Sequence, residues 1–260
     1  MSITDEGHYG PKQLNLLKTV WGEGFLSPGG TDEIDEVVKG IDITDKSILD
    51  IGCGCGGAAI HLIKSHGAKS VLGIDIEPLV VKRAEELAAR QGLSNLTQFR
   101  CVKPGPLNIP DESVDLVFSK EVFLHISNKE NLMKDIHRVL KPSGLVVASD
   151  WMRIDDNPPS LLMQEYIDAE GLDMYMCSLK HYEKLLEKVG FIDITIKDRN
   201  AWYLVKAKQE LVAIEGPLND KVIEAIGPEE TVGAIDIWKK LIEVLEIGEH
   251  RPGHFKAVKK

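Results

Sequence analysis

The stretch LDIGCGCGG, residues 49–57, decides the fold because it places three glycines directly after an apolar run. Gly52, Gly54 and Gly57 have the G-x-G-x-x-G spacing that forms a tight turn between a strand and a helix in nucleotide-binding sheets. Asp50 stands two residues before the first of these glycines. Two kinds of ligand therefore compete for the turn: the pyrophosphate of a nicotinamide cofactor, or a ligand without phosphate.

On either side of this turn, short apolar runs alternate with helical patterns. This alternation predicts an α/β fold with a parallel sheet that is covered on both faces. Thr31 is the expected N-cap of an early helix, and Gly67 the expected end of the helix that follows the turn. The expected strands are 47–51, 70–76, 96–102, 114–121, 145–151, 191–199 and 254–260, and the expected helices are 11–20, 31–41, 57–67, 78–92, 129–144, 178–190, about 200–215 and 229–247.

Composition narrows the classes of partner. The chain has 260 residues and a net charge of −10 at pH 7, so long-range repulsion opposes binding to nucleic acids and anionic membranes. The sequence contains neither a secretory signal nor an apolar run long enough to span a bilayer. Its four cysteines favour a reduced, cytoplasmic protein. Cys53 and Cys55 lack nearby His or Cys partners, so no metal site is expected.

The position of Asp50 bears on which ligand the turn binds. In sheets of this kind the ligand lies at the carboxyl ends of the strands, where the glycine turn also lies. A carboxylate beneath the turn is unfavourable for a diphosphate, whereas it suits a ligand with a cationic amino group. S-adenosylmethionine carries such a group and a positive sulfonium, and it has no phosphate.

The chain resembles the S-adenosylmethionine-dependent class I methyltransferases of the doubly wound type. Their first motif corresponds to Asp50-Ile51-Gly52-Cys53-Gly54, and two further segments match in VDLVFSKEVFLHI (114–126) and RVLKPSGLVVASD (138–150). The resemblance implies a mostly parallel seven-stranded sheet with a reversed C-terminal strand, for which HFKAVKK (254–260) is the candidate. An acid at Asp75 alone does not separate this class from nicotinamide enzymes, but a reversed final strand does.

The resemblance also implies the residues that bind the cofactor. Asp75 would bind the ribose hydroxyls and Ile76 would pack on the adenine. Many relatives carry an aspartate near the end of the third strand that accepts from the adenine amino group, but this chain has Lys103 there, and a lysine cannot accept that hydrogen bond. Backbone groups at Val102 or Pro104 are the alternative. The full expected set is Asp50, Gly52, Gly54, Asp75, Ile76, Ser27, Val102, Lys103 and Lys120.

Within this class the chain resembles the phosphoethanolamine, or phosphobase, N-methyltransferases. The resemblance lies in VWGEGFLSPGG (20–30), SKEVFLHIS (119–127) and PGHFKAVKK (252–260). It implies that His125 is the catalytic base and that Tyr9, with Ser27, closes over the cofactor. An amine must lose a proton to attack a methyl group, and a histidine can accept it. Glu121 is the expected anchor for the cationic amine. Without the resemblance, His125 would instead be interpreted as capping a turn.

The predicted substrate pocket departs from that family. Its phosphate-binding tyrosines correspond to Trp151 and Tyr166, its arginine to Glu170, a further tyrosine to Leu172 and its lysine to Leu241. A phosphate that faced Glu170 would lose a bidentate partner and be repelled. We therefore favour a small amine without phosphate over a phosphobase in a reworked pocket. An O- or C-methyltransferase and a cofactor-binding module without catalysis remain alternatives.

The predicted organisation is one methyltransferase domain over 1–260. Within it we expect N-terminal lid helices in 1–45, a cofactor-binding core in 46–151, and substrate-pocket helices with a strand insert in 152–250. The expected partners are S-adenosylmethionine and a small-molecule amine, with neither nucleic acid nor membrane.

Overall fold

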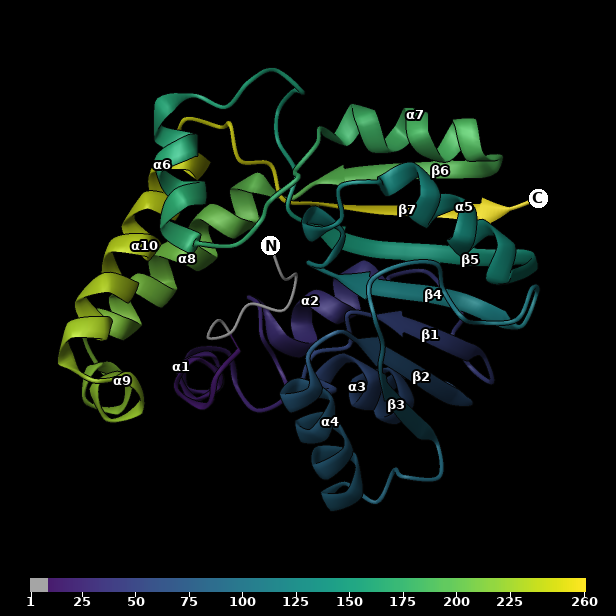
Figure 1. Ribbon diagram of the computed structural model, residues 1–260, viewed down its shortest axis with the longest axis horizontal. Coiled ribbons are helices and arrows are strands. Elements are labelled where there is room, and N and C mark those ends of the chain that lie inside the picture. The colour runs from purple at the N-terminus through teal and green to yellow at the C-terminus, as the bar shows by residue number, and fades with distance from the viewer. Residues whose placement is uncertain (1–8) are drawn as a thin grey trace.

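The strand that precedes the glycine turn, β1 (Ser47–Ile51), lies inside a seven-stranded sheet with the order β3-β2-β1-β4-β5-β7-β6. In this computed structural model, which describes residues 9–260, strands β1 to β5 are parallel and β7 runs antiparallel to both of its neighbours (Figure 1). The reversed final strand expected from the resemblance is thus confirmed. The other strands are β2 (Ser70–Asp75), β3 (Thr97–Cys101), β4 (Val114–Lys120), β5 (Leu140–Asp150), β6 (Phe191–Asp198) and β7 (Gly253–Lys259).

Helices cover both faces of the sheet, as the apolar strands require. Ile48 and Leu49 are adjacent in β1 and fully buried, yet they belong to different apolar clusters because successive side chains point to opposite faces. The cluster around Ile48 includes residues of α2 (Gly30–Val37), α3 (Gly57–His66) and α4 (Pro78–Arg90). The cluster around Leu49 includes residues of α5 (Lys129–Val139) and α7 (Leu179–Val189).

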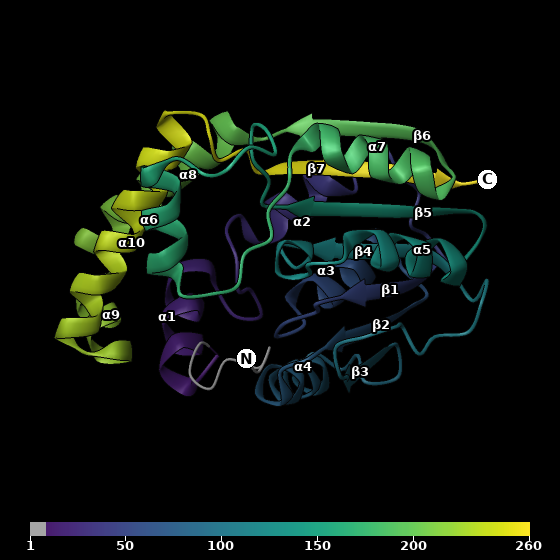
Figure 2. The ribbon, with the colours of Figure 1, turned by 45° about the horizontal axis from the view of Figure 1, so that its top comes forward.

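A second group of helices lies beyond the carboxyl ends of the parallel strands (Figures 1 and 2). In this group α10 packs against α8 and α6, and α9 packs against α1. The members are α1 (Pro11–Trp21), α6 (Leu161–Glu170), α8 (Asn200–Glu215), α9 (Asn219–Ile226) and α10 (Pro228–Glu246). Ligands of doubly wound sheets bind at this end, so the second group is placed to cover the site.

Several local expectations were wrong. Thr31 lies inside α2, whose N-cap is Gly29 with a φ of 93°, because two glycines start the helix earlier. The helix expected over 129–144 ends at Val139, and β5 begins at Leu140. The buried Leu140 pairs with Val114 of β4 before the register of the two strands shifts. Helices α6 and α9 were not expected. α6 has little amphipathic character and α9 is only eight residues long, so neither gives a strong periodic signal.

None of the helices in residues 9–260 combines the length and the apolar character that crossing a bilayer requires.

Candidate active site

The glycine turn requires glycine for two measurable reasons. Gly52 has a φ of 72°, a left-handed conformation that side chains disfavour. A Cβ at this position would also lie 2.0 Å from the Cγ2 atom of Val122. Its amide donates to the carbonyl oxygen of Ile74 at 2.8 Å, so the turn is held against the neighbouring strand β2.

Asp50 lies beneath this turn and is almost fully buried, with 1% of its surface exposed. Its Oδ2 atom has no hydrogen-bond partner among residues 9–260. Burial, together with the nearby charge of Asp75, raises the pKa of Asp50 to about 8. A buried carboxylate with an unpaired oxygen is stabilised by a cationic donor and destabilised by another anion. This geometry favours an ammonium over a diphosphate as the ligand of the turn.

Asp75, at the end of β2, faces the turn from the other side. Its Oδ2 atom accepts from the amide of Gly54 at 2.9 Å, and its Oδ1 atom from the amide of Glu77 at 3.0 Å. Burial raises its pKa despite these hydrogen bonds. Each carboxylate oxygen can still accept a second hydrogen bond, so the group fits a pair of ligand hydroxyls.

The segment expected to contact adenine is more open. Ile76 and Val102 are half-buried, whereas Lys103 is exposed. The amide of Val102 already donates to the backbone oxygen of Asp75 at 2.8 Å. Since that N–H is occupied, an adenine contact at Val102 would have to use its other atoms.

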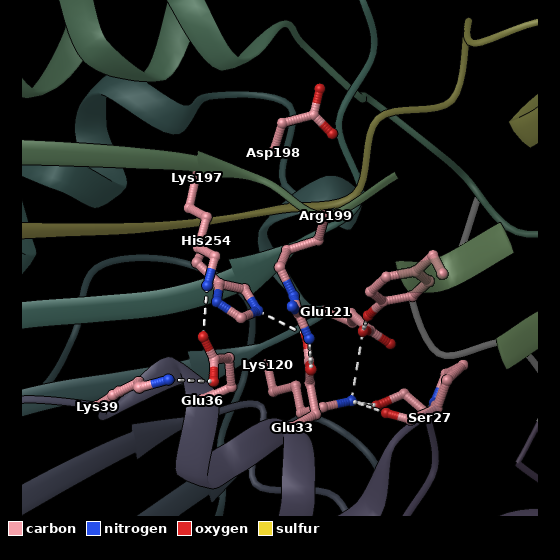
Figure 3. Close-up of polar contacts among 12 residues, drawn as sticks. Ser27, Glu33, Glu36, Lys39, Lys120, Glu121, Lys197, Asp198, Arg199 and His254 are labelled. Carbon is pink, nitrogen blue, oxygen red and sulfur yellow. Dashed lines mark hydrogen bonds and ion pairs between the residues drawn. The ribbon is translucent and has the colours of Figure 1, made fainter. Parts of the chain in front are cut away.

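A buried network joins the end of β4 to the segment before α2 (Figure 3). The ammonium of Lys120 donates to the Ser27 hydroxyl and, at 2.9 Å, to the carbonyl oxygen of Pro28. It also forms an ion pair with Glu121 at 3.3 Å, in which both side chains are less than a tenth exposed. Lys120 and Ser27 were expected to contact the cofactor, and in the structure they bind each other.

Glu121 has a second partner in this network. Its Oε1 atom accepts from the hydroxyl of Tyr203, while its Oε2 atom has no partner in the described part of the chain. Its φ is 57°, an unusual conformation for a glutamate. Burial raises its pKa, although Lys120 opposes the shift. One oxygen of this buried acid is therefore available to a cationic group.

A further buried set of charges supports α2, and the sequence analysis did not identify it (Figure 3). Glu33 is fully buried, and it contacts Arg199 at 2.5 Å and the ring of His254 at 2.6 Å. Burial raises the pKa of Glu33, but these two partners more than offset that effect and keep the pKa below its usual range. The contacts hold α2 against the start of α8 and against β7. They join residues more than 160 positions apart, so no local pattern indicates them.

His125 lies in a short 3₁₀ helix, η1 (Phe123–His125), immediately after β4. Its Nδ1 atom hydrogen-bonds to the backbone oxygen of Asp173 at 2.9 Å. When Nδ1 donates this bond, the neutral ring carries its lone pair on Nε2. The preceding residue is also fixed, because the amide of Leu124 donates to the Asp150 carboxylate at 3.1 Å. The same carboxylate accepts from the Tyr182 hydroxyl at 2.5 Å.

Tyr9 is half-buried and packs with Leu14, Cys55 and neighbouring apolar residues. Burial raises its pKa, and the charges of Asp75 and Glu170 raise it further. Asp75 belongs to the sheet and Glu170 to α6. The phenol of Tyr9 therefore lies close enough to both sides of the site for each charge to affect its pKa.

Three rings meet where α6 approaches the end of β5. Trp151 and Tyr166 have ring centroids 6.2 Å apart, and His250 lies 5.3 Å from the first and 5.8 Å from the second. His250 was not identified from the sequence. It precedes β7 in a segment without a recognisable motif.

The two positions at which the resemblance implied an arginine and a lysine hold Glu170 and Leu241. Glu170 is half-buried, and burial raises its pKa to about 7 while the hydroxyl of Tyr166 opposes the shift. Leu241 is buried in the apolar cluster that also contains Tyr166. The neighbouring Lys240 lies 3.7 Å from Asp236.

Three potential metal ligands meet away from this site. The sequence analysis did not bring them together. Both His61 and His66 contact the same oxygen of Asp35, at 2.6 and 2.7 Å. The group joins α2 to α3, and hydrogen bonds account for its geometry.

Comparison with known proteins is consistent with this geometry. A family model described as a methyltransferase domain matches residues 49–148. A 2-methyl-6-phytyl-1,4-hydroquinone methyltransferase from Synechocystis is 31% identical over 98% of this chain and 80% of its own length. The chain belongs to the S-adenosylmethionine-dependent class I methyltransferases. Their cofactor is S-adenosylmethionine, and the unpaired oxygen of Asp50 and the glycine turn fit its ammonium-bearing end.

Two other similarities point to one branch of this class. Phosphoethanolamine N-methyltransferase 1 from Arabidopsis thaliana is 30% identical over 98% of this chain, which spans about half (51%) of that protein. The structure of a Haemonchus contortus phosphoethanolamine N-methyltransferase 2, in complex with phosphomonomethylethanolamine and S-adenosylhomocysteine, superposes with a TM-score of 0.90 at 24% identity. That match covers 99% of this chain and 60% of the other. This methyltransferase therefore resembles the phosphoethanolamine enzymes in sequence and in fold.

Proposed function

We propose that this methyltransferase transfers a methyl group to the nitrogen of a small amine. The observation that supports this best is a buried acid at the carboxyl end of β4. The Oε2 atom of Glu121 has no partner among residues 9–260. His125 follows Glu121 four residues later in the chain. An anion and a base at one strand end suit a substrate that arrives as an ammonium and must react as a free amine. The named activity of the Arabidopsis relative supports the same class of reaction.

We propose that His125 accepts the proton of the amine. Free alkylamines have pKa values of about 10, so nearly all of the substrate is protonated at neutral pH. With Nδ1 donating to the oxygen of Asp173, the Nε2 atom of His125 is the proton acceptor. Such a positioned base contributes roughly 10²- to 10⁴-fold to the rate. In this proposal Tyr9 orients the amine and covers the site.

The cofactor would be held by residues from three strand ends. Asp50 would bind its ammonium, Asp75 its ribose hydroxyls and Ile76 its adenine. When bound, S-adenosylmethionine supplies an electrophilic methyl group on its sulfonium. We assign residues 46–151 to this binding and residues 152–250 to the substrate, in line with the second group of helices over the strand ends.

A second candidate is methylation of a quinol, which the named activity of the Synechocystis relative favours. A phenol also needs a base, so His125 would serve either reaction. Glu121 and Glu170 favour the amine, since a phenolate next to two carboxylates would be repelled.

The proposal is tested by incubating the purified chain with S-adenosylmethionine labelled in its methyl group and a panel of acceptors. The panel contains ethanolamine, phosphoethanolamine, sarcosine and a substituted hydroquinone. We expect label on nitrogen in at least one amine product. Methylation of the hydroquinone alone would refute the proposal, and binding of the cofactor without transfer to any acceptor would favour a module without catalysis.

A further inference from the structure

Trp151 and His250 bury polar nitrogen atoms that lack partners. The indole Nε1 of Trp151 and both ring nitrogens of His250 have no hydrogen bond in the part of the chain that the structure describes. His250 is fully buried, and its ring is perpendicular to that of Trp151. Leaving a buried donor unpaired is unfavourable, so three such atoms on two touching rings point to a ligand that completes them.

Two carboxylates act on Tyr166, which contacts both of these rings. Burial raises the pKa of the Tyr166 hydroxyl, and the charges of Glu170 and Glu121 raise it further. Burial alone lowers the pKa of His250 to about 3, which keeps its ring neutral at physiological pH. The rings therefore offer neutral hydrogen bonds in acidic surroundings.

One cation near these rings, Arg153, already pairs with an acid. Arg153 forms an isolated bridge with His250 through the backbone. Its guanidinium donates to Glu249 at 2.8 Å and to the backbone oxygen of Asn157 at 2.7 Å. A dianionic phosphate needs charge-assisted donors. The Nε atom of Arg153 has no partner among residues 9–260, but Glu249 already neutralises the charge of this guanidinium.

We propose that Trp151 and His250 bind the end of the substrate opposite its amine, and that this end is an oxygen group with at most one negative charge. The substrate is then a small amino alcohol or amino acid, and a phosphomonoester is disfavoured. This inference rests on the proposed N-methylation and adds the substrate class and the two residues that select it.

The donor and acceptor pattern fits these two substrate types. The indole of Trp151 can only donate, whereas a neutral imidazole offers one donor and one acceptor. A substrate hydroxyl can accept from Trp151 and donate to His250. A carboxylate can accept from both rings. In either case the ammonium would lie toward Glu121, whose Oε2 atom has no partner in the part of the chain that the structure describes.

The first test compares acceptors on the full chain with S-adenosylmethionine. Steady-state rates are measured with ethanolamine, sarcosine and phosphoethanolamine. We expect kcat/KM for ethanolamine or sarcosine to exceed that for phosphoethanolamine at least tenfold, and the better of the two identifies the oxygen group. A preference for phosphoethanolamine would overturn this inference and leave N-methylation intact, whereas transfer to a hydroquinone and to no amine would overturn both.

The second test uses Trp151→Phe, which removes the indole N–H and keeps an aromatic ring. We expect KM for the preferred amine to rise several-fold, with little change in kcat. The melting temperature should stay the same or increase, because the lost donor has no partner among residues 9–260. The matched control is Trp238→Phe, since Trp238 donates to Glu210 at 3.2 Å in a different apolar cluster.

The control variant should lower the melting temperature and leave KM unchanged. His250→Leu should raise KM as Trp151→Phe does, and His250→Gln, which retains a donor and an acceptor, should recover part of the loss. If both Trp151→Phe and His250→Leu melt at lower temperature with an unchanged KM, the two rings are structural and the inference is wrong.

Discussion

The amide of Gly54 lies 2.9 Å from the Oδ2 atom of Asp75, so the turn after β1 is tied directly to the acid that ends β2. Asp50 lies beneath the same turn, and the charge of Asp75 contributes to its raised pKa, so the two carboxylates are close enough to interact. The turn thus does more than change the direction of the chain, because its backbone also binds Asp75.

Gly52→Ala should destabilise the protein and weaken cofactor binding. The left-handed conformation alone costs about 1–2 kcal/mol for a residue with a side chain, and the added Cβ would overlap Val122 at 2.0 Å. The matched control is Gly92→Ala, because Gly92 has a φ of 70° but no atom of residues 9–260 lies within 4 Å of an added Cβ. Urea unfolding of both variants separates the clash from the conformational cost, and equal losses would show that the contact with Val122 is unimportant.

Asp50→Asn should weaken S-adenosylmethionine binding roughly 10- to 100-fold, the size expected for losing a hydrogen bond to a charged group. The free protein should be at least as stable as before, because the substitution removes a buried acid. Isothermal calorimetry gives the affinity. Asp45→Asn, at an exposed position with a φ of 60°, is the control with the same chemical change. Unchanged affinity in Asp50→Asn would remove the basis for placing the ammonium there.

The affinity for S-adenosylmethionine should also depend on pH. Asp50 in the free protein has a pKa of about 8 and must be ionised to pair with an ammonium. Affinity should therefore fall as pH is lowered below about 8, by at most tenfold per pH unit for one proton. Calorimetry between pH 6.5 and 8.5 tests this, and Asp50→Asn should show a flatter dependence.

The stability of the free protein should fall as pH rises from 6.5 to 8. The pKa values of Asp50, Asp150 and Glu210 are raised by burial, to about 8, 7 and 7. Their ordinary values are 3.8, 3.8 and 4.5, so the folded protein holds protons in this range that the unfolded chain has lost. Each such proton contributes up to about 1.4 kcal/mol per pH unit.

The pH range from 6.5 to 8 avoids an opposing effect from His250. Burial lowers the pKa of His250 from 6.5 to about 3. Between these two values the unfolded chain binds a proton that the folded protein does not, so stability falls as pH is lowered below 6.5. Unfolding free energies from urea titrations at several pH values provide the measurement. Glu210→Gln, far from the glycine turn, should reduce the slope. A stability that rises with pH between 6.5 and 8 would contradict the raised pKa values of these three acids.

Lys120→Met should destabilise the protein by about 3–5 kcal/mol, because it leaves Glu121 buried without its cation. The double variant Lys120→Met with Glu121→Gln should recover part of this loss, since the uncompensated charge is then removed. Urea unfolding of the two single variants and the double variant completes a mutant cycle. Strict additivity would mean that the two side chains do not interact.

His125→Gln should lower kcat roughly 10²- to 10⁴-fold if this ring is the base, with S-adenosylmethionine affinity unchanged. His137→Gln is the control, because His137 packs on Phe191 at 5.0 Å and belongs to α5. Rates across pH 6 to 9 distinguish a base from a positioning residue. If His125 is the base, His125→Gln removes the rise in kcat with pH. If His125 only positions another group, the variant keeps this rise at a lower kcat.

The sequence alone determined the parallel sheet, the glycine turn and the cofactor class. The turn, the acid at Asp50 and the alternation of strands and helices are properties of neighbouring residues, and periodicity reports them directly. α6 was missed because it has little amphipathic character, and α9 because it is only eight residues long. The early start of β5 at Leu140 was missed because Pro142 and Gly144 indicated the end of a helix there.

Only the tertiary structure decided which polar groups meet. Glu33 finds Arg199 and His254, Asp150 finds Tyr182, and His250 joins Trp151 and Tyr166 across long stretches of chain. The local sequence does not indicate these pairings, because the packing of distant helices and strands brings the groups together. The residues proposed for the cofactor lie mainly on adjacent strand ends, where the sequence pattern places them, whereas the residues proposed for the substrate come from segments that are far apart in the chain.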